Sequence, residues 1–183
     1  MVASGVICDF DWPAPDFRLL GTDGVFYERS NIMGSNGLLV MFICNHCPYV
    51  LGALDRLIET SADLQSKGIG VGAISSNDVN SYPEDSFENM TKLAKEYKFR
   101  FPYLYDETQE VARAYRAVCT PDFFGFNKNF GLQYRGRLDS TSNASVSQEI
   151  KRELYEGMLQ IAETGLGPKD QVASIGCSIK WKG

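Results

Sequence analysis

The segment Leu38-Leu39-Val40-Met41-Phe42-Ile43-Cys44-Asn45-His46-Cys47-Pro48 decides the fold of this chain. Its first six residues form a short apolar run after a loop at 30–37 that contains two glycines and two asparagines. Such a run is typical of a β-strand buried on both faces. From Val50 to Ala62, apolar residues recur at three- and four-residue spacing, which predicts an amphipathic helix. The two cysteines are therefore expected where a central strand passes into a helix.

Strands and helices are predicted to alternate along the rest of the chain. A capping box formed by Ser81 and Glu84 is expected to begin the second long helix. In chain order, the other expected elements are a hairpin within 14–29, a strand at 69–74, a helix over about 84–98, a strand at 101–105, a short helix capped by Asp106, strands at 122–127 and 132–137, and a helix over about 146–164. This order predicts a single three-layer α/β domain over residues 1–183, with a mixed central sheet and a C-terminal tail at 165–183.

Composition and charge exclude several classes of protein. The chain has 183 residues, of which 44% are hydrophobic and 22% charged, as in soluble globular proteins. With 18 basic and 23 acidic residues, the net charge of -5 disfavours nucleic acid as a partner. No run reaches about 18 apolar residues, so no membrane partner is expected. Because no secretory signal is visible at the N-terminus, the expected location is the cytoplasm.

The cysteines point to redox chemistry. The chain contains five of them, Cys8, Cys44, Cys47, Cys119 and Cys177. An odd number of cysteines without a secretory signal disfavours a disulfide framework. Only Cys44 and Cys47 are close in sequence, and the sole histidine, His46, lies between them. If Cys44 caps the following helix, the helix start should lower the pKa of its thiol from about 8.5 to roughly 3.5–7.5. The spacing also permits a disulfide across the first helical turn.

A zinc site is the main structural alternative for a Cys-X-X-Cys segment. Four protein ligands would require Cys119, Cys177 and His46 to fold together with the pair, because there is no second Cys-X-X-Cys. The strand-to-helix context favours a redox pair instead. We therefore expect no metal and no cofactor other than a redox-active Cys44–Cys47 disulfide.

The segment 42–50 resembles the thioredoxin superfamily, and most closely the peroxiredoxin-like redoxins of the AhpC/TSA group. The resemblance covers nearly the whole chain, and Cys-Asn-His-Cys-Pro at 44–48 is one of its most specific parts. The other matching segments are Ala14-Pro15-Asp16-Phe17, Ile74-Ser75-Ser76-Asn77-Asp78, Cys119-Thr120-Pro121-Asp122-Phe123, Tyr134-Arg135-Gly136-Arg137-Leu138-Asp139 and Gly176-Cys177-Ser178-Ile179-Lys180-Trp181.

This resemblance implies a thioredoxin-like fold with an N-terminal hairpin extension and an inserted strand-helix segment. It implies a thiol-disulfide oxidoreductase in which Cys44 attacks, Cys47 resolves the mixed disulfide, and the Thr120–Pro121 bond is cis and faces the pair. The alternative for Pro121 is an ordinary loop proline. Asn45 and Pro48 would support the site. The implied partners are a disulfide-containing protein or small molecule, which would pair with the backbone before Pro121, and a thiol reductant.

Two departures from related proteins affect the expected chemistry. Leu38 stands where thioredoxin has a buried acid, and Val50 stands where related membrane-anchored reductases have a glutamate. The sequence therefore offers no obvious carboxylate to deprotonate Cys47. His46 resembles the residue at this position in disulfide isomerases and oxidases, so it should be catalytic. It should also make the cysteine pair more oxidising than that of thioredoxin, whose reduction potential is about -270 mV.

Two other functions remain open. A peroxidase would use Cys44 as its peroxidatic thiol, but Gly37 and Met41 occupy the proline and threonine/serine positions of the peroxiredoxin pattern, and the expected arginine is not evident. A metal-binding or redox-sensing protein would instead use Cys44 with His46 and Cys47.

Four further residues are secondary candidates. Cys119, near Pro121, and Cys177, in the tail, are either extra redox thiols or packed apolar side chains. Asn77 and Asp78 follow a strand and could line the cleft, because sites in α/β sheets gather at the carboxyl ends of strands.

Overall fold

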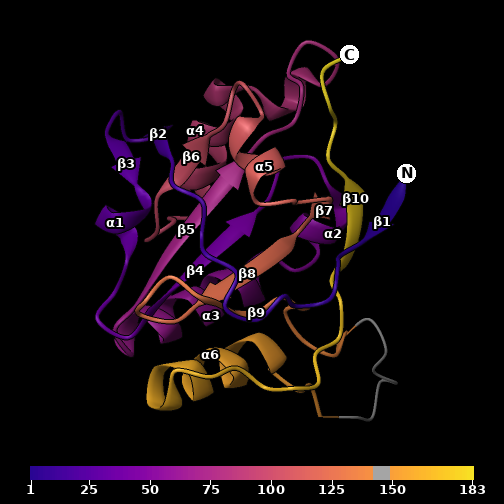
Figure 1. Cartoon of the computed structure of the whole chain (residues 1–183). Coiled ribbons are helices and arrows are strands. Elements are labelled where there is room, and N and C mark those ends of the chain that lie inside the picture. The colour runs from indigo at the N-terminus through magenta and orange to yellow at the C-terminus, as the bar shows by residue number, and fades with distance from the viewer. Residues whose placement is uncertain (142–148) are drawn as a thin grey trace.

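The chain is built around a mixed seven-stranded sheet, described by a computed structural model at all residues except 142–148 (Figure 1). The strand order is β3-β2-β6-β5-β4-β8-β9. The central strands β4 (Gly37–Phe42), β5 (Ile69–Ser75) and β6 (Tyr103–Tyr105) are parallel, whereas β8 (Asp122–Phe126) is antiparallel to β4. The predicted mixed sheet is thus confirmed.

The edges of this sheet are formed by antiparallel strands. The expected N-terminal hairpin is present as β2 (Arg18–Gly21) and β3 (Phe26–Glu28), and β2 pairs with β6. On the opposite edge, β9 (Leu132–Tyr134) pairs with β8 and is shorter than the strand expected at 132–137.

A second, three-stranded sheet brings the two ends of the chain together. It consists of β1 (Val2–Ser4), β10 (Ile175–Ser178) and β7 (Cys119–Thr120), with β10 antiparallel to both neighbours. In Figure 1 the yellow strand β10 lies between the indigo strand β1 and β7. The sequence did not predict this sheet, because its strands are short and lack regular alternation.

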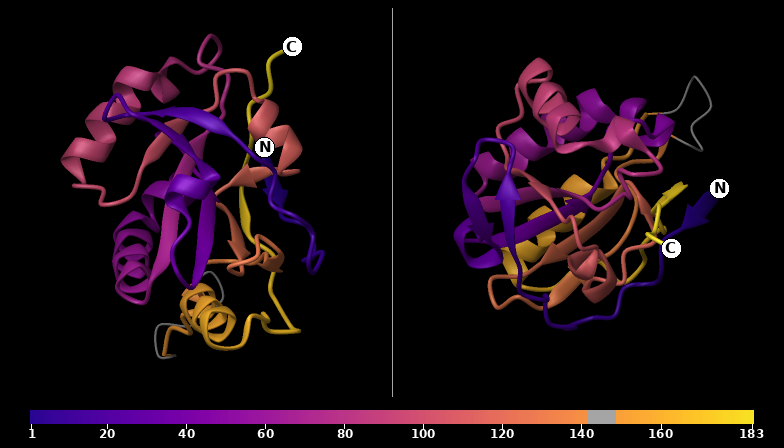
Figure 2. Two further views of the ribbon diagram at one scale, coloured as in Figure 1. Left: turned by 60° about the vertical axis from the view of Figure 1, so that its left-hand side comes forward. Right: turned by 90° about the horizontal axis from the view of Figure 1, so that it is seen from above.

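Helices cover both faces of the large sheet, which gives the expected three layers (Figure 2). One face carries α3 (Leu54–Ser66), α4 (Phe87–Glu96) and α6 (Glu153–Thr164); the other carries α1 (Arg29–Ile32) and α5 (Glu110–Ala114). Of the helix expected at 146–164, residues 146–148 lie outside the described residues, and α6 begins later than expected, at Glu153. None of the helices in the described part of the chain is long and apolar enough to cross a membrane.

Strand β4 contributes to two separate cores, as its continuous apolar run predicts. Alternate residues point to opposite faces of a strand. Leu39 and Met41 belong to the core under α3, α4 and α6, whereas Leu38 and Val40 belong to the core under α5. The strand is therefore fixed on both faces, and its carboxyl end is a rigid position for the cysteines that follow.

One of two predicted helix starts is wrong. Ser86, not Ser81, caps α4 by accepting a hydrogen bond from the Asn89 amide, while the Ser81 hydroxyl donates to Asp78. Helix α5 begins after Gln109, and Asp106 caps it as expected, because its carboxylate accepts hydrogen bonds from the Val111 and Ala112 amides in the first turn.

Candidate active site

The two close cysteines lie at the end of β4 and the start of a short helix, α2 (Pro48–Leu51). The residue that caps α2 is Cys47, and Pro48 is its first residue, so the expected capping role of Cys44 is wrong. Proline has no amide hydrogen and a fixed φ, which suit the first helical position. The long helix expected here is also divided, because α2 ends at Gly52 and α3 begins at Leu54.

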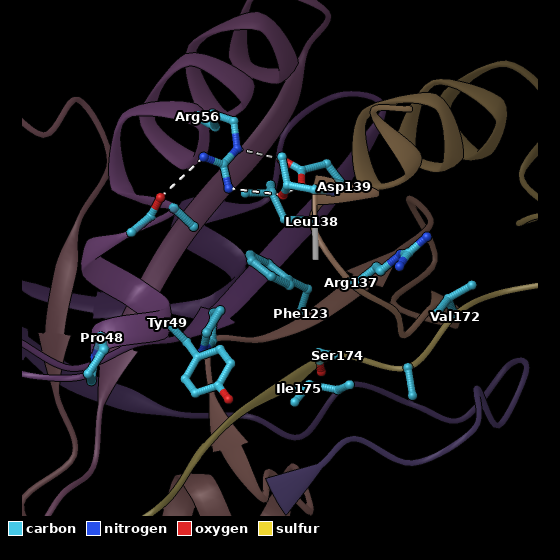
Figure 3. A pocket seen from close by; sticks show the side chains of 15 residues that line it. Pro48, Tyr49, Arg56, Phe123, Arg137, Leu138, Asp139, Val172, Ser174 and Ile175 are labelled. Atoms are coloured by element: carbon cyan, nitrogen blue, oxygen red, sulfur yellow. Dashed lines mark hydrogen bonds and ion pairs between the residues drawn. The ribbon is translucent and has the colours of Figure 1, made fainter. Parts of the chain in front are cut away.

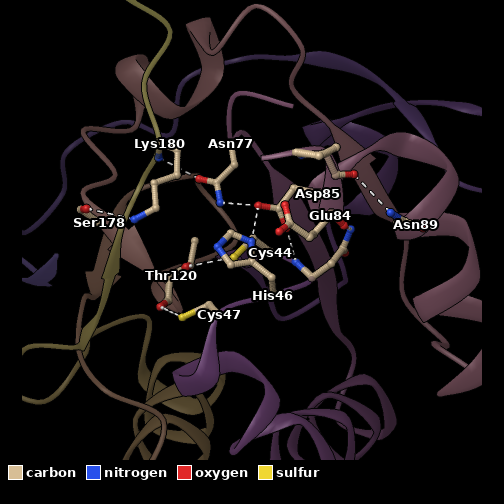
Figure 4. A network of polar contacts seen from close by, with 12 residues as sticks. Cys44, His46, Cys47, Asn77, Glu84, Asp85, Asn89, Thr120, Ser178 and Lys180 are labelled. Atoms are coloured by element: carbon tan, nitrogen blue, oxygen red, sulfur yellow. Dashed lines mark hydrogen bonds and ion pairs between the residues drawn. The ribbon is translucent and has the colours of Figure 1, made fainter. Parts of the chain in front are cut away.

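Thr120 contacts both sulfur atoms (Figure 4). Its Oγ1 lies 3.4 Å from Cys44 Sγ, and its carbonyl oxygen accepts a hydrogen bond of 3.2 Å from Cys47 Sγ. The Thr120–Pro121 peptide bond is cis, as the resemblance implied. Cys44 is 1% exposed and Cys47 is 0% exposed. The structure thus brings together the two cysteines and the predicted Thr120–Pro121 segment in a buried site.

The two thiols influence each other's acidity. The interaction with the Cys44 thiol lowers the pKa of Cys47, and the Val50 amide adds to the effect. The same interaction with Cys47 raises the pKa of Cys44, as do burial and the negative charge of Asp85, whereas the Thr120 hydroxyl acts in the opposite direction. In the structure the Cys47 sulfur is a thiol, because it donates to the Thr120 carbonyl.

A buried carboxylate, which the sequence analysis missed, lies beside this pair. Asp85 is 0% exposed, and its Oδ2 lies 2.7 Å from His46 Nδ1. The same carboxylate accepts hydrogen bonds from the Asn45 amide at 2.8 Å and from Asn77 Nδ2 at 2.7 Å. These two hydrogen bonds offset part of the cost of burying the charge of Asp85, whereas His46 Nδ1 lies at ion-pair distance without hydrogen-bond geometry. The carboxylate fixes the orientation of the imidazole next to Cys44.

The local sequence around Asp85 does not indicate that its carboxylate lies in the site. It ends a 3-10 turn at Pro83–Asp85, which the capping pattern assigned to the start of a helix. The sequence pointed to this region only through Asn77, which follows β5. Asn77 lies in the site, and its Nδ2 donates a hydrogen bond to Asp85. Asp78, the other strand-end candidate, instead accepts hydrogen bonds from Ser81 and the Asn80 amide.

Asn45 and His46 are held in place by neighbours outside the motif. The Tyr103 hydroxyl donates to Asn45 Oδ1 at 2.9 Å, and Asn45 Nδ2 donates to the Glu84 carbonyl at 3.0 Å. The His46 ring stacks on Tyr82, with 5.5 Å between ring centroids. Asn45 therefore fixes the loop, whereas His46, with 27% of its side chain exposed, covers Cys44 on the solvent side.

The same residues form a possible metal-ligand set. One ligand atom from each of Cys44, His46 and Asp85 lies within 4.8 Å of the others. This set contains Asp85 in place of the Cys47 that we expected. Sulfur, imidazole and carboxylate ligands together suit a zinc ion, although the Asp85 oxygens already accept two hydrogen bonds within the protein.

The two other candidate thiols have different surroundings. Cys119 is buried, and its sulfur lies 3.6 Å from the Pro121 carbonyl oxygen and 3.8 Å from Ser174 Oγ. Burial raises the pKa of Cys119 to about 12, so this thiol is protonated and packs as a small side chain. Cys177 lies on β10, directly opposite Thr120, and its thiol interacts with that of Cys47.

The backbone before Pro121 is not free to bind an extended substrate, which corrects the expectation of strand addition at this position. Thr120 pairs with Cys177 and Cys119 pairs with Ser178, so β10 of the same chain occupies the edge of β7. The short, irregular tail sequence gave no indication of this pairing.

A groove of about 690 Å³ runs beside the site (Figure 3). The part of the groove next to the redox motif is lined by Pro48 and Tyr49 of α2, by Pro121 after β7, and by Ile175 of β10. At the other end of the groove, Arg56 Nε donates to Asp139 Oδ2 at 2.8 Å. The groove thus combines an apolar floor next to the cis proline with a charged pair.

Comparisons with known proteins agree with this architecture. The AhpC/TSA family matches residues 11–139. The crystal structure of an uncharacterized conserved protein from Geobacillus kaustophilus is 40% identical, with a TM-score of 0.93, and the match covers 100% of this chain and 97% of that one. A hypothetical protein from Sinorhizobium meliloti 1021 is 34% identical, with a TM-score of 0.90 and 98% of each chain covered.

A more distant likeness extends to the thioredoxin domain of a thiol-disulfide oxidoreductase from Bacteroides vulgatus. It is 17% identical with a TM-score of 0.59, and the match covers 70% of this chain and 89% of that domain. At this identity the likeness shows the fold, which is thioredoxin-like as predicted. No curated protein matches the chain in sequence.

Proposed function

The chain belongs to the AhpC/TSA family, and from this premise we propose that it is a thiol-disulfide oxidoreductase that uses the pair Cys44 and Cys47. The observation that carries the proposal is the contact of both sulfur atoms with Thr120, next to the cis bond before Pro121. Two thiols at the start of a helix, which influence each other's pKa, are suited to disulfide exchange, since the thiolate is the reactive form.

The reaction proceeds through a mixed disulfide. The Cys44 sulfur attacks one sulfur of a substrate disulfide, and the other substrate sulfur leaves with the electron pair of the broken bond and takes a proton. Cys47 then attacks Cys44, which forms the Cys44–Cys47 disulfide and releases the second substrate thiol. The substrate gains two electrons and two protons, and the cysteine pair loses them; the reverse sequence oxidises a dithiol.

Cys44 attacks as its thiolate, so its proton has to leave first. The Thr120 hydroxyl, 3.4 Å from Cys44 Sγ, stabilises this thiolate by donating a hydrogen bond to it and so lowers the pKa of Cys44. We assign His46 and Asp85 to positioning and electrostatic roles, because the imidazole lies between the carboxylate and the exposed side of Cys44.

The groove beside α2 supports binding of a polypeptide or another extended disulfide. Tyr49 is 43% exposed there and offers an aromatic contact next to Pro121. The reductant that restores the dithiol would be another thiol, and no metal or other cofactor enters this mechanism.

Peroxidase activity has weaker support, although family membership permits it. A peroxidatic thiolate needs hydrogen-bond donors that bind the departing oxygen in the transition state. In the described part of the chain, Cys44 has the Thr120 hydroxyl as a partner and no arginine hydrogen-bonded to it. This arrangement favours disulfide exchange over reduction of a peroxide.

A redox titration with turnover measurements tests the proposal. The wild-type protein should convert reversibly between a dithiol and a Cys44–Cys47 disulfide, located by peptide mass spectrometry, and should reduce insulin disulfides in the presence of a thiol reductant. The midpoint should lie above the value of about -270 mV that is typical of thioredoxin. A pair that does not cycle, or a protein without exchange activity, would exclude this function.

His46→Ala should lower the reduction potential by about 30 mV or more. The variant leaves the negative Asp85 next to the sulfurs without the imidazole, so the thiolate form is destabilised and the reduced state is less favoured. Asp85→Asn should change the potential in the opposite direction, because it removes that negative charge. Equal or same-direction shifts in the two titrations would contradict the assigned roles.

A further inference from the structure

We infer that Cys177 is a third redox thiol, which exchanges with the buried pair to form a Cys47–Cys177 disulfide. The inference rests on the proposed function of Cys44 and Cys47 and extends it. It also gives β10 a role, since the C-terminal strand lies where an extended substrate was expected and presents a cysteine there.

The register of β10 places Cys177 in the site. Cys177 lies directly opposite Thr120 in the antiparallel pair of β7 and β10. Side chains of directly opposed residues extend on the same face of a sheet, with Cβ atoms about 4.5–5.5 Å apart. Because the Thr120 hydroxyl contacts Cys44, the side chain of Cys177 lies on the side of β7 that carries the redox pair.

Three contacts bring Cys177 close to Cys47 in particular. Cys177 packs against the core cluster that contains Cys44 and Cys47. Its thiol interacts with the Cys47 sulfur. Helix α2, which Cys47 caps, also packs against β10. Cys177 thus joins the pair Cys44 and Cys47 in one cluster, although it is distant from them in the sequence.

Cys177 is more accessible to solvent than the other two thiols, so a reductant can reach it more easily. Cys44 and Cys47 are 1% and 0% exposed, whereas Cys177 is partly exposed. A reductant that reaches Cys177 does not have to enter the space under His46. Transfer of the disulfide from Cys44–Cys47 to Cys47–Cys177 would bring an accessible sulfur into the bond.

The exchange balances without an external oxidant. The Cys177 thiolate attacks Cys47, a Cys47–Cys177 bond forms, the Cys44–Cys47 bond breaks, and its electron pair leaves on Cys44. The proton lost by Cys177 is equivalent to the one that Cys44 takes up. The protein neither gains nor loses electrons, so this step only moves the disulfide.

Oxidation of the pair prepares Cys177 for this attack. In the reduced protein, burial and the neighbouring Cys47 sulfur raise the pKa of Cys177 to about 11, while Lys180 acts in the opposite direction. When Cys47 enters a disulfide, its sulfur can no longer ionise, so it no longer raises the pKa of Cys177, whereas Lys180 still lowers it. Cys177 therefore ionises more readily once the Cys44–Cys47 disulfide has formed, which is the stage at which its thiolate attacks.

The direct test uses Cys44→Ser, which leaves Cys47 and Cys177 as the only neighbouring thiols of the cluster. Oxidised dithiothreitol is added, free thiols are alkylated, and the linked peptides are identified by mass spectrometry. The inference requires an intramolecular Cys47–Cys177 disulfide as the principal linkage. Its absence, or linkage of Cys47 to Cys8 or Cys119, would overturn the inference.

A kinetic test does not require that Cys44→Ser folds. In Cys177→Ser, the Cys44–Cys47 disulfide should still form, but its reduction by dithiothreitol should be about tenfold slower than in wild type. Cys8→Ser is the matched control and should leave the rate unchanged. An unchanged rate in Cys177→Ser would refute the inference alone, whereas a wild-type pair that forms no disulfide would refute the proposed function.

Discussion

Replacement of Cys44 by serine is expected to reduce disulfide-exchange turnover at least about a thousandfold, because removal of a nucleophile eliminates the covalent step itself. Serine is close in size to cysteine, and the site is fully packed, so the fold should be retained. Cys47→Ser should be equally inactive, since it has no thiol to resolve the mixed disulfide. Turnover is measured with insulin or a glutathione mixed disulfide, and the fold by circular dichroism.

The two serine variants can be distinguished by what they accumulate. In Cys47→Ser, the mixed disulfide between Cys44 and substrate should persist and be detectable as an increase in mass. Cys8→Ser provides the matched control, because Cys8 lies outside the cluster of redox thiols and the variant should retain full turnover. A folded Cys44→Ser protein that keeps more than about a tenth of wild-type turnover would contradict the mechanism.

The second large effect is on stability and concerns a buried ion pair next to the site. Arg135→Ala should reduce the free energy of unfolding by about 3–5 kcal/mol, the typical cost of leaving a buried charge without its partner. Arg135 is 6% exposed and its Nη2 lies 3.3 Å from Oδ2 of Asp122, which is 0% exposed. For a chain of this length, the loss corresponds to a fall of roughly 6–20 °C in Tm.

Further contacts of Arg135 add to this cost. Its Nη2 donates to the Arg116 carbonyl at 2.7 Å, and its guanidinium lies 4.5 Å from the centre of the Phe124 ring. Lys92→Ala is a suitable control, because Lys92 forms an ion pair with Glu88 that is exposed to solvent and therefore contributes little to stability. Similar losses for the two variants in urea unfolding would show that the buried pair has no special importance.

Periodicity was sufficient to predict the central sheet and the layers of this fold. The run at 38–43 has to be a strand because both of its faces are apolar, and the helices on either side follow from their spacing. The small sheet of β1, β7 and β10 was not predictable in this way. Its strands have two to four residues, so pairing between distant segments, rather than local pattern, determines it.

The candidate site shows the same division between local and distant information. A short motif predicted the position of Cys44 and Cys47 at the end of a strand, but not the groups that set their acidity. The pKa values of the two thiols depend on Asp85 and on interactions within the folded cluster. A sequence pattern identifies the residue types that can react, whereas their protonation depends on groups brought together by folding.

The burial of both sulfurs has a consequence for chemical damage. Because Cys44 and Cys47 are almost completely buried, oxidants and alkylating agents, like substrate disulfides, react with them only after a local opening of the site. At high reagent concentration, the rate of inactivation would then reach a plateau set by the opening step. A reactive thiolate can in this way coexist with long survival under oxidative stress.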